Sequence, residues 1–313
     1  MRSAPGTVAV IGAGSIGSSW VALALAHGLT VHAADPDPGI DARLRATVTA
    51  HLAELDAGPE ALDRLTVHID VAEAAAVADM VIEAGPERLD VKRTLFAALD
   101  EVAAPDVVLA SSSSGFGPSA FQDGCRHPDR VVVAHPFNPP HLIPLVEVVG
   151  GTQSSEETVE ATIAAMTRLD RRPVRVRTEL PGHVVNRLQA ALWREAYYLI
   201  GQGAISVADL DRAVSNGPGL RWALLGPIAT QHLSGGSGGL RHVLEHLGPP
   251  MVDWWADLGA PDLTPELSDQ LVDGVREEFD GLEREVLARR DRALRELLAL
   301  KGRLELGLAN GSE

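Results

Sequence analysis

A proline-rich segment at residues 134–147, AHPFNPPHLIPLVE, holds two histidines and a glutamate. Proline is excluded from helix interiors and from most central strands, so this segment is expected to be a rigid, mostly extended excursion after the strand-like run RVVV. An imidazole, with a pKa of about 6.5, suits a base at neutral pH, and a carboxylate on its far nitrogen would stabilise the imidazolium. His135 and Glu147 could form such a pair if the chain folds back on itself. For His141 we expect packing or a loop hydrogen bond instead.

A glycine pattern lies between the first predicted strand and the first predicted helix. In VAVIGAGSIGSSW, Gly12 permits a tight turn, Gly14 lets the backbone approach a pyrophosphate, and Gly17 allows the helix to pack closely on the strand. The helix is expected to begin near Ser15 and Ile16, where free N–H groups would face the phosphates. The pattern alone is a weak signal, but a strand, these glycines, a helix and a second strand in this order are typical of a dinucleotide site.

An aspartate follows the second predicted strand. Asp35 lies eighteen residues after Gly17, about where a carboxylate accepts hydrogen bonds from the adenine ribose hydroxyls. An acid at this point would repel a 2′-phosphate, so NAD is predicted as the cofactor in preference to NADP. The alternative is a glycine-rich turn in another kind of α/β protein, with Asp35 as a solvated loop acid.

The first half of the chain alternates short apolar runs with helix-like stretches. Continuous apolar strands are typical of a parallel sheet covered on both faces, and the alternation predicts a doubly wound α/β domain. We expect strands at 7–11, 30–34, 80–84, 107–111 and 130–134, with further strands at 146–151 and 173–177, and helices at 16–27, 41–55, 92–103 and 156–169.

Helical patterns dominate from Pro181 onwards. We therefore predict a Rossmann-type α/β domain over residues 1–180, followed by an all-α domain over residues 181–313. The segment 276–301 has leucines at helical spacing amid dense charge. This pattern predicts a helix that borders solvent or packs against a second subunit.

The composition is that of a globular protein that works without a membrane or nucleic acid. The chain has 313 residues, a net charge of −16 and one cysteine. The negative charge argues against binding nucleic acid or an anionic membrane through a general positive field, and one cysteine cannot form an internal disulfide. No apolar run is long enough for a membrane helix. The first strand is expected almost at once, without room for a signal peptide, so a cytoplasmic location is predicted.

Three segments resemble the 3-hydroxyacyl-CoA dehydrogenase family: VIEAGPERLDVKRTLFAALDEVAAPDVVLASSSSG (81–115), the proline-rich segment, and PGHVVNRLQAAL (181–192). The resemblance runs from about residue 7 to about residue 230. It implies a Rossmann-type domain, a helical domain that usually dimerises, and NAD-dependent oxidation of a hydroxyl β to a carboxyl or thioester. The stretch GPGLRWALLGPIATQHL (217–233) is more similar to the branch that contains lambda-crystallin, L-gulonate 3-dehydrogenase and carnitine dehydrogenase.

The resemblance also implies catalytic roles for four residues. His135 matches the catalytic histidine of the family, and Glu147 matches its paired acid. Ser114 matches the serine that contacts the substrate hydroxyl or carbonyl, and Asn186 matches an asparagine that reaches in from the second domain.

Three further residues match family positions near the cofactor. Glu87 and Lys92 match positions near the nicotinamide ribose and the pyrophosphate. Ser112 stands where many members have an asparagine beside the nicotinamide, which leaves its cofactor contact in doubt. The sequence shows no metal-ligand spacing, so no metal site is predicted.

The substrate is the least determined feature. Residues 36–79 carry positive charge only on Arg43, Arg45 and Arg64, which argues against a specific CoA site. Arg221 is a candidate for binding a small carboxylate, with an inter-helix salt bridge as the alternative. We expect a homodimeric NAD-dependent dehydrogenase of a small or non-CoA 3-hydroxy compound, of the L-gulonate or carnitine dehydrogenase type. A biosynthetic β-ketoreductase acting on a polyketide-like acid, a 3-hydroxyacyl-CoA dehydrogenase and a crystallin-like NAD-binding structural protein are the alternatives.

Overall fold

The computed structural model describes residues 5–304 of the chain. The chain divides into two compact units, Met1–Arg187 and Leu188–Glu313, which are described separately below. The division falls within helix α6 (Val185–Gly201), a few residues after the predicted domain boundary at residue 180.

The first unit is built on an eight-stranded sheet in the order β3-β2-β1-β4-β5-β6-β7-β8. Neighbouring strands are parallel except for β6 and β7, which are antiparallel. The chain reverses there because only the short segment 137–144 joins the two strands, and a parallel neighbour would need a longer crossover. The strands are β1 (Thr7–Ile11), β2 (Thr30–Ala34), β3 (Leu65–His68), β4 (Met80–Glu83), β5 (Val108–Ser111), β6 (Val131–Pro136), β7 (Leu145–Gly150) and β8 (Arg172–Val176).

The sequence patterns located most of these strands to within two residues but missed β3. Its residues, LTVH, alternate only weakly, and two of the four are half-buried. The antiparallel pair is likewise an exception to the parallel sheet that was predicted.

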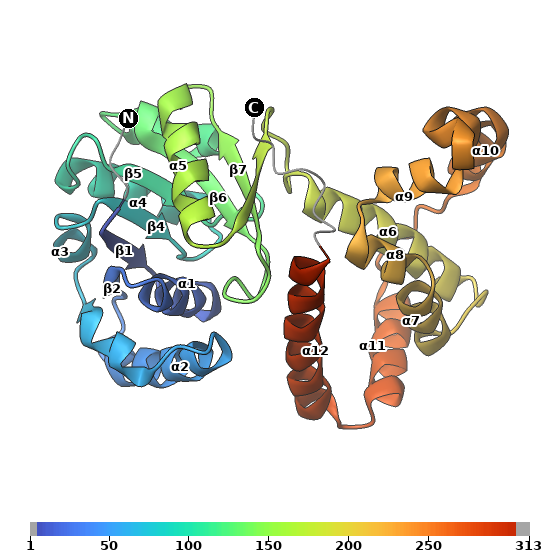
Figure 1. Cartoon of the computed structure of the whole chain (residues 1–313), viewed down its shortest axis with the longest axis horizontal. Coiled ribbons are helices and arrows are strands. Elements are labelled where there is room, and N and C mark those ends of the chain that lie inside the picture. Colours follow the sequence, from blue (N-terminus) through green and yellow to red (C-terminus); the bar gives the residue numbers. More distant parts are fainter. Residues whose placement is uncertain (1–4, 305–313) are drawn as a thin grey trace. The chain divides into compact units, whose positions relative to one another are not determined.

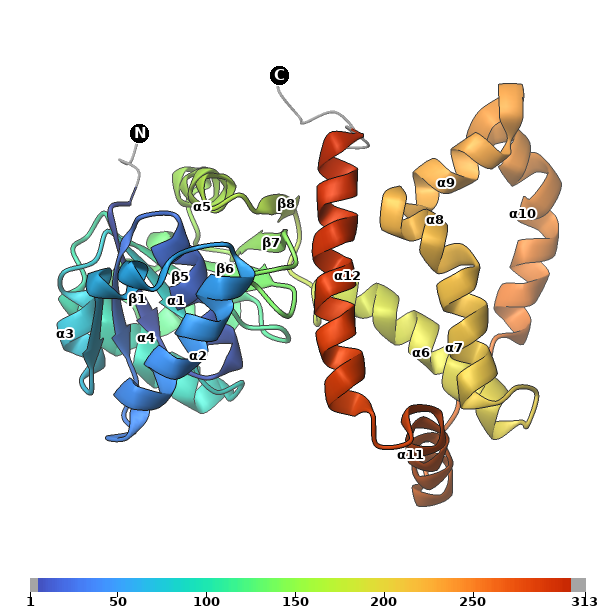
Figure 2. The ribbon, with the colours of Figure 1, turned by 60° about the horizontal axis from the view of Figure 1, so that its bottom comes forward.

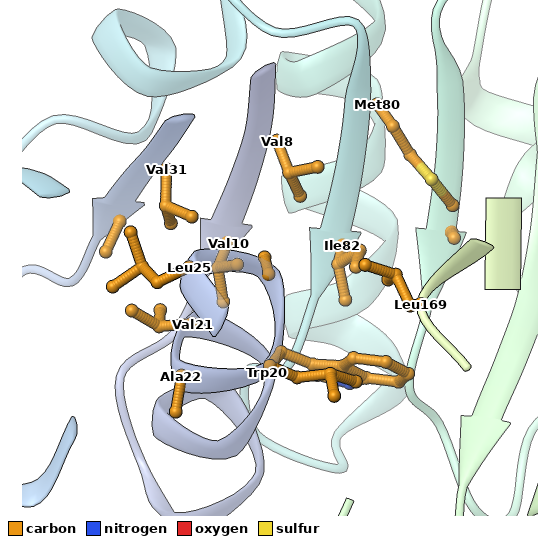
Figure 3. Close-up of a cluster of buried hydrophobic side chains, with 14 of the residues drawn as sticks. Val8, Val10, Trp20, Val21, Ala22, Leu25, Val31, Met80, Ile82 and Leu169 are labelled. Carbon is orange, nitrogen blue, oxygen red and sulfur yellow. The ribbon is translucent and has the colours of Figure 1, made fainter. Parts of the chain in front are cut away.

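Helices cover both faces of the sheet, so its central strands are buried on both sides (Figure 1). One face carries α1 (Ser15–Ala26), α2 (Ile40–Glu54) and α5 (Glu156–Arg168), and the other carries α3 (Val71–Ala75) and α4 (Leu89–Val102). Each face of the sheet has its own apolar core, the first under α1, α2 and α5 and the second under α3 and α4. Alternate residues of one strand therefore pack into different cores. Figure 3 shows the first core, in which Val8 and Val10 of β1 lie with Trp20 of α1.

The second unit is wholly helical in its described part (Figure 2). After α6 come α7 (Val207–Asn216), α8 (Pro218–Leu224), α9 (Pro227–Ser234), α10 (Gly239–Asp257), α11 (Pro265–Phe279) and α12 (Glu283–Arg303). A single helix over 276–301 was the wrong prediction, because Asp280 and Gly281 adopt φ angles of 48° and 78° and end α11. Left-handed backbone is accessible to glycine and tolerated by aspartate, so the Asp-Gly pair was the available signal. Between residues 5 and 304 no helix is both long and apolar enough to cross a membrane.

Candidate active site

The glycine turn joins β1 to α1 where the strand order of the sheet reverses, between β1 and β4. Gly12 has a φ of +96°, and a Cβ there would lie 2.6 Å from the carbonyl oxygen of Ala84. A Cβ on Gly17 would lie 1.8 Å from the carbonyl oxygen of Gly12, whereas the Cβ position of Gly14 has no atom within 4 Å. Packing inside the unit therefore requires glycine at positions 12 and 17, while position 14 leaves open space for a ligand.

A cleft of about 940 Å³ opens beside this turn. Asp35 lines it, and its carboxylate accepts hydrogen bonds from the backbone N–H groups of Ala13 (2.9 Å) and Asp37 (3.1 Å). Helix α1 begins at Ser15, so the N–H groups of Ser15 and Ile16 have no acceptor within the helix. The rest of the wall is largely apolar and includes Ile11, Val71, Val91, Leu95 and Ala98. An apolar slot, a fixed carboxylate and a helix N-terminus fit an adenine, a ribose and a pyrophosphate, respectively.

The serine loop, Ser111–Gly115, begins at the last residue of β5 and is shaped by an anion. One oxygen of Glu87 accepts hydrogen bonds from the Ser113 hydroxyl (2.7 Å) and from the N–H groups of Ser114 (3.1 Å) and Gly115 (2.7 Å). Burial acts to raise the pKa of the Glu87 carboxyl, but these bonds and a nearby ammonium group outweigh it and hold that pKa below its usual range. Glu87 is therefore ionised at neutral pH and organises the loop.

The ammonium group belongs to Lys92 of α4, whose side chain is only 1% exposed. It donates to both oxygens of Glu83 (3.0 and 2.9 Å) and lies 3.4 Å from an oxygen of Glu87. Glu83 also accepts a hydrogen bond from the Ser111 hydroxyl (2.5 Å). Lys92 thus joins the end of β4 to the serine loop, and its positive charge is compensated by Glu83 and Glu87 inside the protein. A contact between Lys92 and the cofactor stays a prediction.

Ser112 connects the same loop to the first helix. Its hydroxyl accepts a hydrogen bond from the indole N–H of Trp20 (3.1 Å), and its backbone N–H donates to the carbonyl oxygen of Glu83 (2.7 Å). The side chain is half-buried. Ser112 therefore fixes the loop to α1 although many family members have asparagine at this position. The proton of its hydroxyl group is still available to a ligand.

His135 and Glu147 face each other across the antiparallel pair of strands β6 and β7. The Nδ1 atom of His135 lies 2.9 Å from one oxygen of Glu147, and both side chains are buried. The other oxygen of Glu147 accepts hydrogen bonds from the N–H groups of Val184 (2.9 Å) and Val185 (3.0 Å). Burial acts to raise the pKa of the Glu147 carboxyl, but the three hydrogen bonds outweigh it and hold the pKa below its usual range. The carboxylate is therefore an acceptor, and Nδ1 of His135 carries the proton.

A third buried side chain, His183, lies beside this pair and was not singled out from the sequence. Its ring centre is 5.2 Å from that of His135, and its Nε2 atom lies 3.0 Å from the carbonyl oxygen of Ser113. A carbonyl only accepts, so Nε2 carries the proton of a neutral ring. Burial lowers the pKa of His183 below that of a solvated histidine, which keeps the ring uncharged beside His135. The only local signal was Gly182 before it; both residues have positive φ, at 72° and 52°.

Two other predicted residues, Ser114 of the serine loop and Asn186 at the start of α6, contact each other. The side-chain amide of Asn186 donates to the backbone carbonyl oxygen of Ser114 (3.3 Å). Ser114 is exposed and Asn186 is half-buried, so both remain reachable by a small molecule.

Arg221 lies in α8 of the second unit and is exposed. Within residues 5–304 its guanidinium forms no ion pair, so the salt bridge considered as an alternative is not seen there.

Two family profiles match the chain. The NAD binding domain of 3-hydroxyacyl-CoA dehydrogenase matches residues 7–179, and the C-terminal domain matches residues 182–271. The chain belongs to the 3-hydroxyacyl-CoA dehydrogenase family. As a member of this family it is an NAD-dependent 3-hydroxy dehydrogenase, and the predicted cofactor is confirmed.

Individual known proteins are similar over most of the chain. An L-carnitine dehydrogenase from Streptomyces coelicolor is 45% identical over 306 residues, which cover 95% of each chain. One from Pseudomonas sp. is 44% identical and covers 86% of this chain and 85% of its own. The solved structure of FHMPC 5-dehydrogenase, an NAD⁺-dependent dismutase, is 28% identical, with a TM-score of 0.79 over 98% of this chain and 99% of that one. The predicted carnitine dehydrogenase-like branch is thereby confirmed.

The role given to Asp35 can be tested by nucleotide titration. We expect NADH to bind more tightly than NADPH, because a fixed carboxylate repels a 2′-phosphate. Asp35→Ser should reduce the ratio of the two dissociation constants by about tenfold or more, which is roughly 1.4 kcal/mol of selectivity. Quenching of protein fluorescence measures both constants. Asp37→Ser is the matched control, because Asp37 already pairs with Arg43. A wild-type preference for NADPH would contradict the assignment.

Proposed function

We propose that this enzyme oxidises the 3-hydroxyl group of L-carnitine, or of a small 3-hydroxy acid like it, with NAD as the cofactor. The observation that carries the proposal is the buried His135–Glu147 pair at the carboxyl end of β6. Ligands of open α/β sheets bind at that edge. The identity of 45% to an L-carnitine dehydrogenase over 95% of its length supports this choice of substrate.

In this proposal His135 is the general base. Its Nδ1–H group is committed to Glu147 at 2.9 Å, so Nε2 presents a lone pair that can take the proton of the substrate hydroxyl. The imidazolium that forms is stabilised by the carboxylate, which is itself held by the N–H groups of Val184 and Val185. The neutral ring of His183 does not oppose the new charge.

Bound NAD supplies the redox chemistry by accepting a hydride from the substrate carbon. We assign Ser114 and Asn186 to the substrate oxygen, which the hydroxyl and the amide would hold in line with His135 and polarise in the reverse reaction. Their support is the hydrogen bond that brings Asn186 to the serine loop and the exposure of Ser114. Glu87 shapes the loop that presents Ser114.

The basic groups of segment 36–79 favour a substrate without CoA. Each arginine is already held by a partner inside the unit: Arg43 by Asp37 (2.7 Å), Arg45 by Asp41 (2.8 Å) and Arg64 by the carbonyl oxygen of Leu25 (2.8 Å). These cations are therefore not poised to bind the phosphates of CoA. For the carboxylate of a small acid we propose Arg221, because an exposed guanidinium can bind it through two hydrogen bonds.

The reaction can be followed directly by NADH absorbance. The wild-type enzyme should reduce NAD⁺ with L-carnitine at a higher kcat/KM than with L-gulonate, 3-hydroxybutyrate or 3-hydroxybutyryl-CoA. His135→Gln and Glu147→Gln should each lower kcat by about 10²-fold or more, because the first removes the base and the second removes the charge that stabilises its protonated form. His127→Gln is the matched control, since His127 is an exposed histidine in the loop before β6.

The outcomes separate the candidate functions. If kcat/KM were highest with 3-hydroxybutyryl-CoA, the proposed substrate would be a CoA thioester and not carnitine. Failure of all four substrates, with NADH still bound, would point to a biosynthetic ketoreductase. Turnover within a few-fold of wild type in both variants would remove the histidine–glutamate pair from the mechanism.

We also propose that the enzyme is a cytoplasmic homodimer. The second unit leaves many large apolar side chains exposed, which a subunit interface would cover: Leu188, Trp193, Leu220, Trp222, Ile228, Leu233, Leu247, Trp254, Trp255 and Leu263. Its helices bury few side chains of their own. A cytoplasmic location is consistent with a requirement for NAD and with the absence of a spanning helix within residues 5–304.

Sedimentation equilibrium tests the dimer. We expect a mass of twice the chain's 33.1 kDa at micromolar concentration. Trp255→Glu, which places a charge on a side chain that is 64% exposed in the single chain, should weaken the dimer if that residue lies in the interface. A wild-type protein that stays monomeric throughout would contradict the proposal.

A further inference from the structure

Three potential metal ligands that are not among the residues assigned to catalysis meet within the first unit. His51 and Glu54 lie one turn apart near the end of α2, and His141 comes from the segment between β6 and β7. One donor atom from each side chain can be chosen so that all three lie within 4.8 Å of one another. The Nε2 atom of His141 is 2.7 Å from an oxygen of Glu54, and Nδ1 of His51 is 3.9 Å from the same oxygen.

The hydrogen bond to Ser19 orients the His141 ring so that its Nε2 atom faces the other two side chains of the cluster. Its Nδ1 atom lies 3.0 Å from the hydroxyl of Ser19, which in turn donates its single proton to the carbonyl oxygen of Ser15 (3.0 Å). When Ser19 donates to Ser15 and accepts from Nδ1–H, Nε2 of a neutral His141 carries the lone pair that a metal ion binds. Without a metal ion, Nε2 instead carries a proton and donates it to the Glu54 carboxylate at 2.7 Å, so metal binding and this hydrogen bond are alternatives.

We propose that His51, Glu54 and His141 bind a divalent transition-metal ion of the Zn²⁺ type. Two imidazole nitrogens and one carboxylate oxygen are the donor set that such ions prefer, with a fourth position left for water. Ligand atoms about 2.1 Å from zinc in a tetrahedral site lie roughly 3.4 Å apart. The observed distances of 2.7 and 3.9 Å bracket this value, so small side-chain rotations would complete the site.

One side of the site is buried and supported by a hydrogen bond, and the other side is open to solvent. His141 is only 2% exposed and is oriented by Ser19, which is the outer-shell support that metal-binding histidines have. Glu54 is 33% exposed, which gives an ion a route in. The two imidazole rings lie with their centres 4.0 Å apart at an angle of 31°.

A metal here would join α2 to the segment that links His135 to Glu147. That segment is otherwise held by Arg171, whose guanidinium donates to the carbonyl oxygens of Pro140 (2.8 Å) and Ile143 (3.3 Å). The ion would be a structural clip and would take no part in hydride transfer. This inference rests on the geometry of the cluster and is independent of the proposed function.

Metal binding to the full chain tests the inference, with ZnCl₂ and CoCl₂ as the probes after treatment with a chelator. We expect one tightly bound Zn²⁺ per chain by titration calorimetry, a visible absorption band of low-symmetry Co²⁺, and a higher thermal midpoint with Zn²⁺. His51→Gln and Glu54→Gln should each weaken binding by about tenfold or more and abolish the Co²⁺ band. Without metal, both variants should unfold near the wild-type temperature and bind NADH normally.

A histidine pair elsewhere in the chain supplies the matched control. His242 and His246 of α10 also have ring centres 4.0 Å apart, but in the described part of the chain no third donor joins them. His242→Gln should leave the tight site and the Co²⁺ band unchanged. Absence of stoichiometric Zn²⁺ binding, or equal binding by wild type and both cluster variants, would overturn the proposal and leave an imidazolium–carboxylate ion pair between His141 and Glu54.

Discussion

The hydrogen bond between His135 and Glu147 is the interaction around which the candidate active site is organised. It requires two strands that run in opposite directions and a connection short enough to return the chain to the same edge of the sheet. One oxygen of Glu147 orients the imidazole, while the other receives the N–H groups of Val184 and Val185 before α6. A single buried carboxylate thus holds the proposed base and the start of the helix that carries Asn186.

A second buried charge network supports the serine loop of the site. Lys92 compensates Glu83 and lies close to Glu87, and the two glutamates position the serine loop by hydrogen bonds to its hydroxyls and N–H groups. Buried ions are tolerated when they are paired and fully hydrogen-bonded, and losing one partner is then costly. His183 connects the two networks, because it contacts the His135 ring and donates to the carbonyl oxygen of Ser113.

The parts that the sequence predicted well depend on local signals. The glycine turn requires glycine at residues 12 and 17 for reasons of backbone space, and the apolar strands follow from burial on both faces of the sheet. The pairing of His135 with Glu147 was predicted because the two residues, twelve apart, match a pair in the family that the sequence resembles, and the prolines between them restrict the path of the chain.

The features that sequence analysis missed depend on contacts between distant segments. His183 meets Ser113 across seventy residues, and His141 meets Glu54 across eighty-seven, so neither spacing could reveal a cluster. The partners of Lys92 were also inaccessible, since they become known only when the strands are assembled. Its burial did have a local signal, because Lys92 lies four residues before Phe96 and seven before Leu99, on the buried face of α4.

The tautomer of His135 tests the central claim most directly. Nitrogen-15 NMR of the labelled protein with NAD⁺ bound, assigned by the signals that disappear in His135→Asn, reports which ring nitrogen carries the proton. At neutral pH the account predicts a protonated Nδ1 in a strong hydrogen bond and an unprotonated Nε2, with the Nδ1 signal shifted in Glu147→Gln. A proton on Nε2, or signals that do not respond to Glu147→Gln, would contradict it.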